Sequence, residues 1–251
     1  MELTLWTSIE KGMTPEVTRI LRDNPTINVN WQNRDEYDYS GLHIACSEGH
    51  GAIVSLLLAH PLINVDQRTT WGATPFMVAC WYGRTGCARQ FLWLQNVNLN
   101  QRDSAGFSPL YRAACGGHID IIRLWIMSAR PLHLGETHNH KTDAVAVAKL
   151  KRNTAVVALL ERFQADPVAT RNEIADQLVS DVYAHVVFVA DGLLRVRLKE
   201  RLSPTARFFL IAGRLPLELQ MTLCYRVLCS ARLFVPAADS EPAFKRLARI
   251  I

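Results

Sequence analysis

The chain has no long apolar run and no apolar leader at its start. Its most apolar stretch, residues 182–194, is too short to cross a bilayer and contains His185 and Asp191. The opening Met-Glu-Leu-Thr-Leu-Trp shows neither the basic segment nor the continuous apolar segment of a secretion signal. We therefore expect no membrane association and no targeting segment.

Cysteine and charge of a single sign are also scarce. The six cysteines among 251 residues are scattered, as is usual in a reducing compartment, so we expect an intracellular protein, cytoplasmic or nuclear. The net charge of +5 is small and spread along the chain. Because a nucleic-acid interface would show a dense basic stripe, we expect no nucleic acid among the partners.

Sequence motifs of catalysis and metal binding are absent or weak. The chain contains no glycine-rich phosphate loop, no HExxH and no GxSxG. One polar loop holds four side chains that could in principle gather a metal ion, namely His133, Glu136, His138 and His140. No cysteine accompanies them, and His-x-His in a polar loop is usually solvated. We expect no enzymatic activity, no small-molecule substrate, no cofactor and no metal site.

What the sequence does contain is a repeat of 34 residues, in which residues 40–50 align with 74–84 and again with 108–118. The second and third copies begin with Thr-Pro and Ser-Pro, which favour a helix start, because the hydroxyl caps free N–H groups and proline fits the first turn. Gly49, Gly83 and Gly117 stand where each first helix should end in a left-handed conformation, and a second apolar helix follows. A period of this length predicts a solenoid, which binds partners along an extended surface.

These copies resemble the ankyrin repeat, with its Thr-Pro-Leu-His start, its pair of small residues, its Gly-His and its Asn- and Asp-rich hairpin. The resemblance covers about five units within residues 3–163: Leu3–Arg34, Asp35–Arg68, Thr69–Arg102, Asp103–Ser128 and Asp143–Phe163. The last unit is degenerate, because Arg152 stands at the glycine position. The resemblance implies an all-α ankyrin-repeat solenoid, which we assign to residues 1–165. It also implies that His43, His50 and His118 hydrogen-bond neighbouring turns.

After about Asp166 the repeat stops, but amphipathic helix patterns continue. We expect helices near residues 171–178, 181–198, 203–214, 216–229 and 240–251. Residues 166–251 are therefore predicted to form a C-terminal helical domain or a cap over the last repeat, whose apolar end needs cover. Within this region, Leu-Pro-Leu-Glu-Leu at residues 215–219 is similar to the opening of an F-box. The same pattern also describes an ordinary buried helix, and the second half of an F-box is missing.

The ankyrin resemblance also implies where a partner would bind, because hairpin tips and outward residues of the first helices form a concave face in such arrays. Seven residues expected on this face are of the types that dominate interface hot spots: Tyr37, Tyr39, Trp71, Trp81, Tyr82, Phe107 and Arg112. We expect the rings of Trp71, Trp81 and Tyr82 to lie side by side and to anchor the partner. The alternative is that several of these rings only pack against neighbouring hairpins.

The function that the resemblance implies is a non-catalytic protein-binding scaffold or adaptor that recognises partner proteins through the concave ankyrin surface. The alternative is a substrate receptor of a cullin-type ubiquitin ligase, in which a degenerate F-box-like segment at residues 215–229 docks the ligase. Both readings require a protein partner, and the sequence does not identify it.

Overall fold

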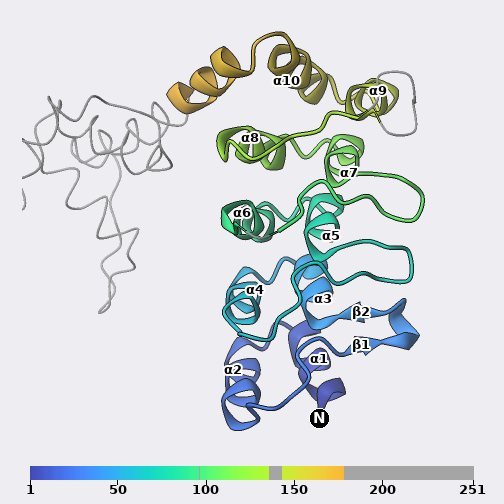
Figure 1. The fold of residues 1–251 in the computed structure, drawn as a ribbon, viewed down its shortest axis with the longest axis vertical. Coiled ribbons are helices and arrows are strands. Elements are labelled where there is room, and N and C mark those ends of the chain that lie inside the picture. The colour runs from blue at the N-terminus through green and yellow to red at the C-terminus, as the bar shows by residue number, and fades with distance from the viewer. Residues whose placement is uncertain (96, 136–142, 178–251) are drawn as a thin grey trace, which may run out of the picture. The chain divides into compact units, whose positions relative to one another are not determined.

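Helix pairs stacked in sequence order form the first part of the chain (Figure 1). The computed structural model describes residues 1–95, 97–135 and 143–177. By its internal contacts the chain divides into Met1–Pro167 and Val168–Ile251, and residues 167–177 are helical. The helices predicted after residue 177, the predicted cap and the F-box-like sequence at residues 215–229 lie outside the described residues.

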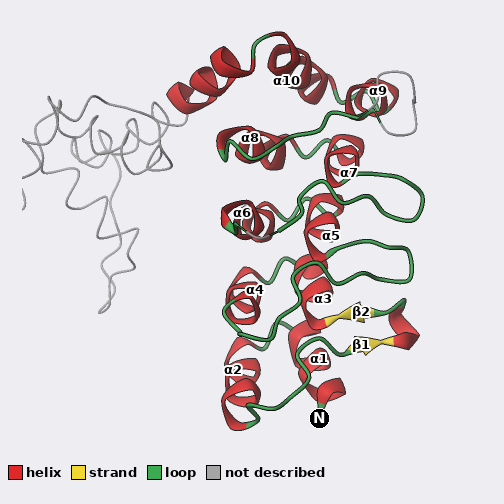
Figure 2. Cartoon of the chain, viewed as in Figure 1, coloured by secondary structure: helices red, strands yellow, loops and turns green. Residues whose placement is uncertain are grey.

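Each pair places its first helix in one layer and its second helix in another (Figure 2). The first helices are α1 (Glu2–Glu10), α3 (Gly41–Glu48), α5 (Pro75–Trp81), α7 (Pro109–Gly116) and α9 (Ala144–Leu150). The second helices are α2 (Thr14–Asp23), α4 (Gly51–Leu58), α6 (Thr85–Trp93), α8 (Ile119–Met127) and α10 (Thr154–Ala165). The loops that lead from one pair to the next project on the side of the first helices. This arrangement confirms the predicted all-α solenoid.

Short strands occur in the first of these loops. Strand β1 (Gln32–Asn33) pairs antiparallel with β2 (Tyr39–Ser40), and a 3-10 turn at Arg34–Glu36 connects them. The next two loops are also closed by backbone hydrogen bonds. The amide of Thr69 donates to the carbonyl of Ala73 at 3.0 Å, and that of Asp103 donates to Phe107 at 3.0 Å. The hairpins are therefore built on one plan, with the first one elaborated into a two-stranded ladder.

The first helices begin at the predicted hydroxyl residues. The Thr74 hydroxyl accepts a hydrogen bond from the amide of Met77, and the Ser108 hydroxyl accepts one from the amide of Tyr111. In each case proline occupies the first helical turn, where no amide hydrogen is needed. These caps satisfy N–H groups that a helix start leaves unpaired, so the helix boundaries follow from local sequence.

The first helices end in left-handed backbone, as the glycines predict. The φ angles of Gly49, Gly83 and Gly117 are 84°, 70° and 73°. Arg152, at the glycine position of the last repeat, also has a positive φ of 60°. The repeat geometry is thus retained there, although a residue with a Cβ adopts this conformation only with strain.

The residue directly after each of these glycines forms a hydrogen bond to the preceding repeat. His50 Nε2 lies 3.1 Å from the carbonyl oxygen of Glu10, and His118 Nε2 lies 3.0 Å from that of Trp81. In the same role, Arg84 Nε donates to the carbonyl of Ser47 at 2.7 Å. These carbonyls belong to helix ends that would otherwise lack partners. The predicted roles of His50 and His118 are confirmed.

The last repeat uses a different residue for the same bond. Asn153 Nδ2 donates to the carbonyl of Ala114 at 2.8 Å, at the end of α7. The sequence pattern did not predict these bonds of Asn153 and Arg84, because neither residue is the histidine that the family pattern has at this place. What the position requires is a donor of suitable length, and three residue types meet that need.

His43 is the third predicted structural histidine, and it is fully buried. Its Nδ1 accepts a hydrogen bond from the amide of Ser40 at 3.1 Å, and its Nε2 lies 3.1 Å from the carbonyl oxygen of Ala73 in the next repeat. Burial lowers the pKa of His43 from 6.5 to about 4, although the bond to Ala73 acts in the opposite direction. This neutral histidine therefore closes the start of α3 and links two repeats.

The core lies between the two helix layers. Phe76 of α5 contacts Phe91 of α6 and Trp125 of α8, with ring centroids 5.9 Å and 5.1 Å apart. Small buried residues such as Cys46 and Cys80 allow neighbouring first helices to approach closely. Among the described residues, no helix is long and apolar enough to cross a membrane.

Candidate partner-binding surface

The hairpins between repeats carry the candidate surface, and hydrogen bonds hold them in register. The amide of Thr70 donates to the carbonyl of Tyr37 at 3.1 Å, and the amide of Ser104 donates to the carbonyl of Trp71 at 2.8 Å. Each bond joins one hairpin tip to the tip of the next repeat. The side chains at these tips therefore project from a connected and ordered backbone.

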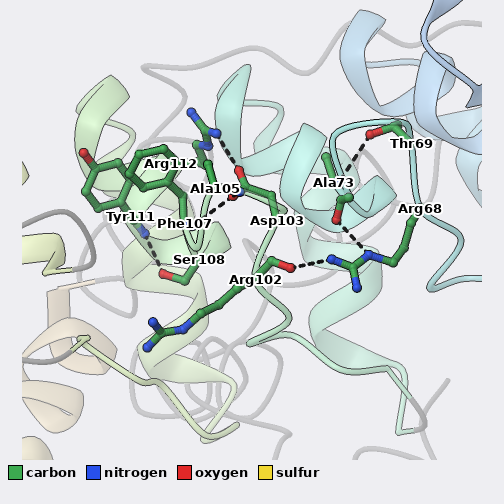
Figure 3. A network of polar contacts seen from close by, with 11 residues as sticks. Arg68, Thr69, Ala73, Arg102, Asp103, Ala105, Phe107, Ser108, Tyr111 and Arg112 are labelled. Atoms are coloured by element: carbon green, nitrogen blue, oxygen red, sulfur yellow. Dashed lines mark hydrogen bonds and ion pairs between the residues drawn. The ribbon is translucent and has the colours of Figure 1, made fainter.

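Arg68 strengthens the second of these hairpins. Its Nε donates to the carbonyl of Gly72 at 3.1 Å, and its Nη2 donates to the carbonyl of Arg102 at 2.8 Å. Figure 3 shows this guanidinium directed onto the backbone of two hairpins, while the side chain of Arg102 extends away from them. Arg68 therefore uses two of its three guanidinium nitrogens to hold the hairpin backbone.

Tyr37 and Trp71 form the first ring pair on the surface. Their ring centroids are 4.7 Å apart and their planes are tilted by 37°. Tyr37 remains 55% exposed and Trp71 remains 49% exposed. Each ring supports the other, and about half of each stays open to solvent.

Arg112 is the centre of a second group of side chains. Its Nη2 donates to Asp103 Oδ2 at 2.5 Å (Figure 3). Its guanidinium lies 3.9 Å from the ring centroid of Trp81 and 4.6 Å from that of Phe107. Phe107 in turn stacks on Tyr111 with centroids 4.6 Å apart. The Arg112 side chain is only 18% exposed, so it is held within this group and supports the rings of Trp81 and Phe107.

Asp103 is the residue of this group that the sequence analysis missed. Its side chain is 3% exposed, and its Oδ1 accepts hydrogen bonds from the amides of Ala105 at 3.0 Å and Phe107 at 2.9 Å. The carboxylate thus has two roles, because it closes the hairpin and also neutralises the charge of Arg112. An aspartate two residues before a turn is a known signal for such a loop, and it could have indicated the first of these roles.

Trp81 and Tyr82 form the second exposed ring pair. Their centroids are 6.3 Å apart with an interplanar angle of 21°, and the residues are 39% and 50% exposed. The expectation that these two rings lie side by side is confirmed. The expectation that Trp71 joins them is wrong, because its ring contact is with Tyr37 of the preceding hairpin. Two separate pairs therefore replace the single predicted trio.

Tyr39 lies between the exposed rings and the core. It is half-buried, and its ring centroid is 5.5 Å from that of His43. Burial raises the pKa of Tyr39 to about 12, with smaller contributions from Tyr82 and Glu36. Its phenol therefore stays protonated and neutral, and its environment includes a negative charge.

The predicted site residues thus fall into two classes. Four of them form what we call the aromatic face: Tyr37, Trp71, Trp81 and Tyr82. The remaining three, Tyr39, Phe107 and Arg112, are half-buried and support these rings. No group of three or more potential metal ligands gathers among the described residues. Two pairs of large, half-exposed rings thus lie on neighbouring repeats.

Comparisons with known proteins agree with the repeat architecture. A family model for ankyrin repeats (three copies) matches residues 5–103 and 62–133, together about half of the chain. The chain is 32% identical over 156 residues to the E3 ubiquitin-protein ligase XBAT33 of Arabidopsis thaliana, covering 59% of the chain and 30% of that protein. It is 34% identical over 128 residues to the human SMC5-SMC6 complex localization factor protein 1, covering 49% of the chain and 12% of that protein.

A further relative is human Rabankyrin-5, which is 32% identical over 95 residues, covering 38% of the chain and 8% of that protein. The chain spans less than a third of the length of each of these relatives.

Proposed function

Because the chain belongs to the ankyrin-repeat family, we propose that it is a non-catalytic scaffold or adaptor that binds a partner protein through the aromatic face. The observation that carries this proposal is the ordered exposure of four large rings on neighbouring repeats. A free protein gains nothing from leaving half of two tryptophans and two tyrosines in water, whereas a partner would bury them.

The energetics favour these rings as anchors. Aromatic side chains offer a large contact area and lose few rotamers on binding, so they dominate interface hot spots. Here the hairpin bonds and the Arg112 group already restrict the backbone and the ring of Trp81. Less ordering entropy is therefore lost when a partner binds, which raises affinity.

The proposal predicts that a Trp71→Ala, Trp81→Ala double variant loses its partner while it remains folded. Removing hot-spot rings typically costs about 2 kcal/mol or more, which is roughly a thirtyfold loss of affinity. Co-purification from the native cell, followed by mass spectrometry, measures the loss. Circular dichroism and the melting temperature show whether the fold is retained.

A matched control is Trp93→Ala. Trp93 is 48% exposed but lies at the end of α6 in the layer of second helices, so its removal should leave the partner bound. If the double variant folds and keeps every partner, recognition does not involve the aromatic face. If it unfolds, the rings serve internal packing.

A second candidate is a substrate receptor for ubiquitin ligation. It is favoured by the Leu-Pro-Leu-Glu-Leu sequence at residues 215–219 and by a relative that is an E3 ubiquitin-protein ligase. In this case Leu215→Ala with Leu219→Ala should remove ligase subunits from the purified complex and spare the partner of the aromatic face.

We also expect an intracellular protein, since the four cysteines in the described part of the chain are free thiols.

A further inference from the structure

Arg112 shows within the chain how this surface holds a cation. Its guanidinium lies over the rings of Trp81 and Phe107 and is paired with the carboxylate of Asp103. A ring face and a carboxylate both attract a positive charge, so together they form a favourable site for arginine or lysine. The same kinds of group occur around the first hairpin.

Glu36 is the carboxylate of that second setting. It is exposed at the end of the 3-10 turn, directly before Tyr37, whose ring contacts Trp71. Its negative charge also contributes to the raised pKa of Tyr39 on the same hairpin. Glu36 therefore stands next to the Tyr37–Trp71 ring pair of the aromatic face.

Within the described ranges, no cation of the chain forms an ion pair with Glu36. The positions equivalent to Arg112 in the two preceding repeats hold Val78 and Ile44, so these repeats have no such arginine. Arg68, which belongs to the hairpin of Trp71, directs Nε and Nη2 to backbone carbonyls (Figure 3). Within the described residues, no arginine therefore pairs with Glu36 as Arg112 pairs with Asp103.

The local charge around Glu36 also favours a bound cation. Residues 34–38 contain three acidic side chains and one arginine, although the whole chain has a net charge of +5. Asp35 and Glu36 are exposed, and Asp38 is partly exposed. The hairpin next to the exposed rings is therefore negative on a positive protein, which favours a basic partner segment.

We propose that the partner segment bound on the aromatic face carries an arginine or lysine side chain, which lies over the exposed rings beside Glu36. This inference rests on the proposed function and specifies the chemistry of the partner. The ring faces supply cation–π attraction and Glu36 supplies a charge-assisted hydrogen bond, as Trp81, Phe107 and Asp103 do for Arg112.

Fluorescein-labelled peptide pools test this directly. The pools have random uncharged residues at all positions except a central one, which is arginine, its uncharged isostere citrulline, or glutamate. Fluorescence anisotropy with the full chain should show that the arginine pool binds about tenfold more tightly than the citrulline pool. Added salt should reduce this preference.

Two charge variants separate the role of Glu36 from a general effect of acidity. Glu36→Gln should abolish most of the arginine preference, whereas Glu16→Gln should retain it. Glu16→Gln is the matched control, because this substitution removes the same charge from α2, where Glu16 pairs with Arg19. Circular dichroism confirms that both variants are folded.

The remaining outcomes contradict the proposal. Equal affinity for the arginine and citrulline pools, or no saturable binding of either, shows that no cation is recognised. Tighter binding of the glutamate pool would indicate that the arginines of the hairpins select an acidic partner. If the arginine preference is absent but the Trp71→Ala, Trp81→Ala variant still loses its cellular partner, this inference fails while the proposed function stands.

Discussion

At the scale of single residues, Arg152 holds a backbone conformation that suits glycine. Its φ is 60° and its side chain is exposed. We predict that Arg152→Gly raises the free energy of unfolding by about 1 kcal/mol, because the strain at Cβ disappears while little packing is lost. Urea denaturation followed by circular dichroism measures the change. Lys151→Gly is the control, since Lys151 has an ordinary φ of −84° and the change should lower stability.

At the scale of elements, the joint between repeats depends on the space that glycine leaves. A Cβ on Gly83 would lie 2.5 Å from Nδ1 of His118, the residue that bonds the carbonyl of Trp81. Gly106 also has a positive φ, of 87°, but a Cβ there would meet nothing within 4 Å. Gly86, in α6, has neither constraint. The three glycines therefore separate steric contact from backbone strain.

We predict a graded response to alanine at these glycines. Gly83→Ala should lower the free energy of unfolding by more than about 2 kcal/mol, because strain and the displacement of His118 combine. Gly106→Ala should lower it by about 1 kcal/mol from strain alone, and Gly86→Ala should leave it unchanged or raise it slightly. Thermal or urea unfolding of the three variants gives the order. Equal losses at Gly83 and Gly106 would contradict the steric role of His118.

The same elements show what could be predicted from sequence. Helix starts at Thr74 and Ser108 and helix ends at the glycines follow from local capping chemistry, so the repeat pattern located them correctly. Ring partners depend on how the hairpin tips turn. The first hairpin has left-handed backbone at Tyr37 and Asp38, and a tyrosine gives no sequence signal for this conformation.

Contacts between repeats were harder still to foresee. The guanidinium of Arg112 meets Asp103, nine residues earlier, and Trp81 of the preceding repeat. A sequence pattern can assign Arg112 to the concave face, but whether it points to solvent or to a buried carboxylate is decided by packing across hairpins. The half-buried, supporting character of this residue is therefore visible only in the structure.

At the scale of the whole molecule, a solenoid gains its stability from contacts between consecutive repeats, so one interface residue affects two repeats. His43 is such a residue, because it caps α3 and bonds Ala73 of the next repeat. Burial lowers the pKa of His43 from 6.5 to about 4. The folded chain thus keeps this histidine neutral at acidic pH values where the unfolded chain binds a proton.

The sign of the pH dependence follows from this difference. The contribution of His43 to stability is fully present above a pH of about 6.5 and is lost as the pH falls toward about 4, by a total of about 3 kcal/mol. Urea denaturation at several pH values in this window should show the free energy of unfolding falling with acidification. His133→Gln, at an exposed position, should keep the wild-type slope. His43→Gln should be less stable near neutral pH but flatter across the window, and an unchanged slope in that variant would assign the pH dependence to other groups.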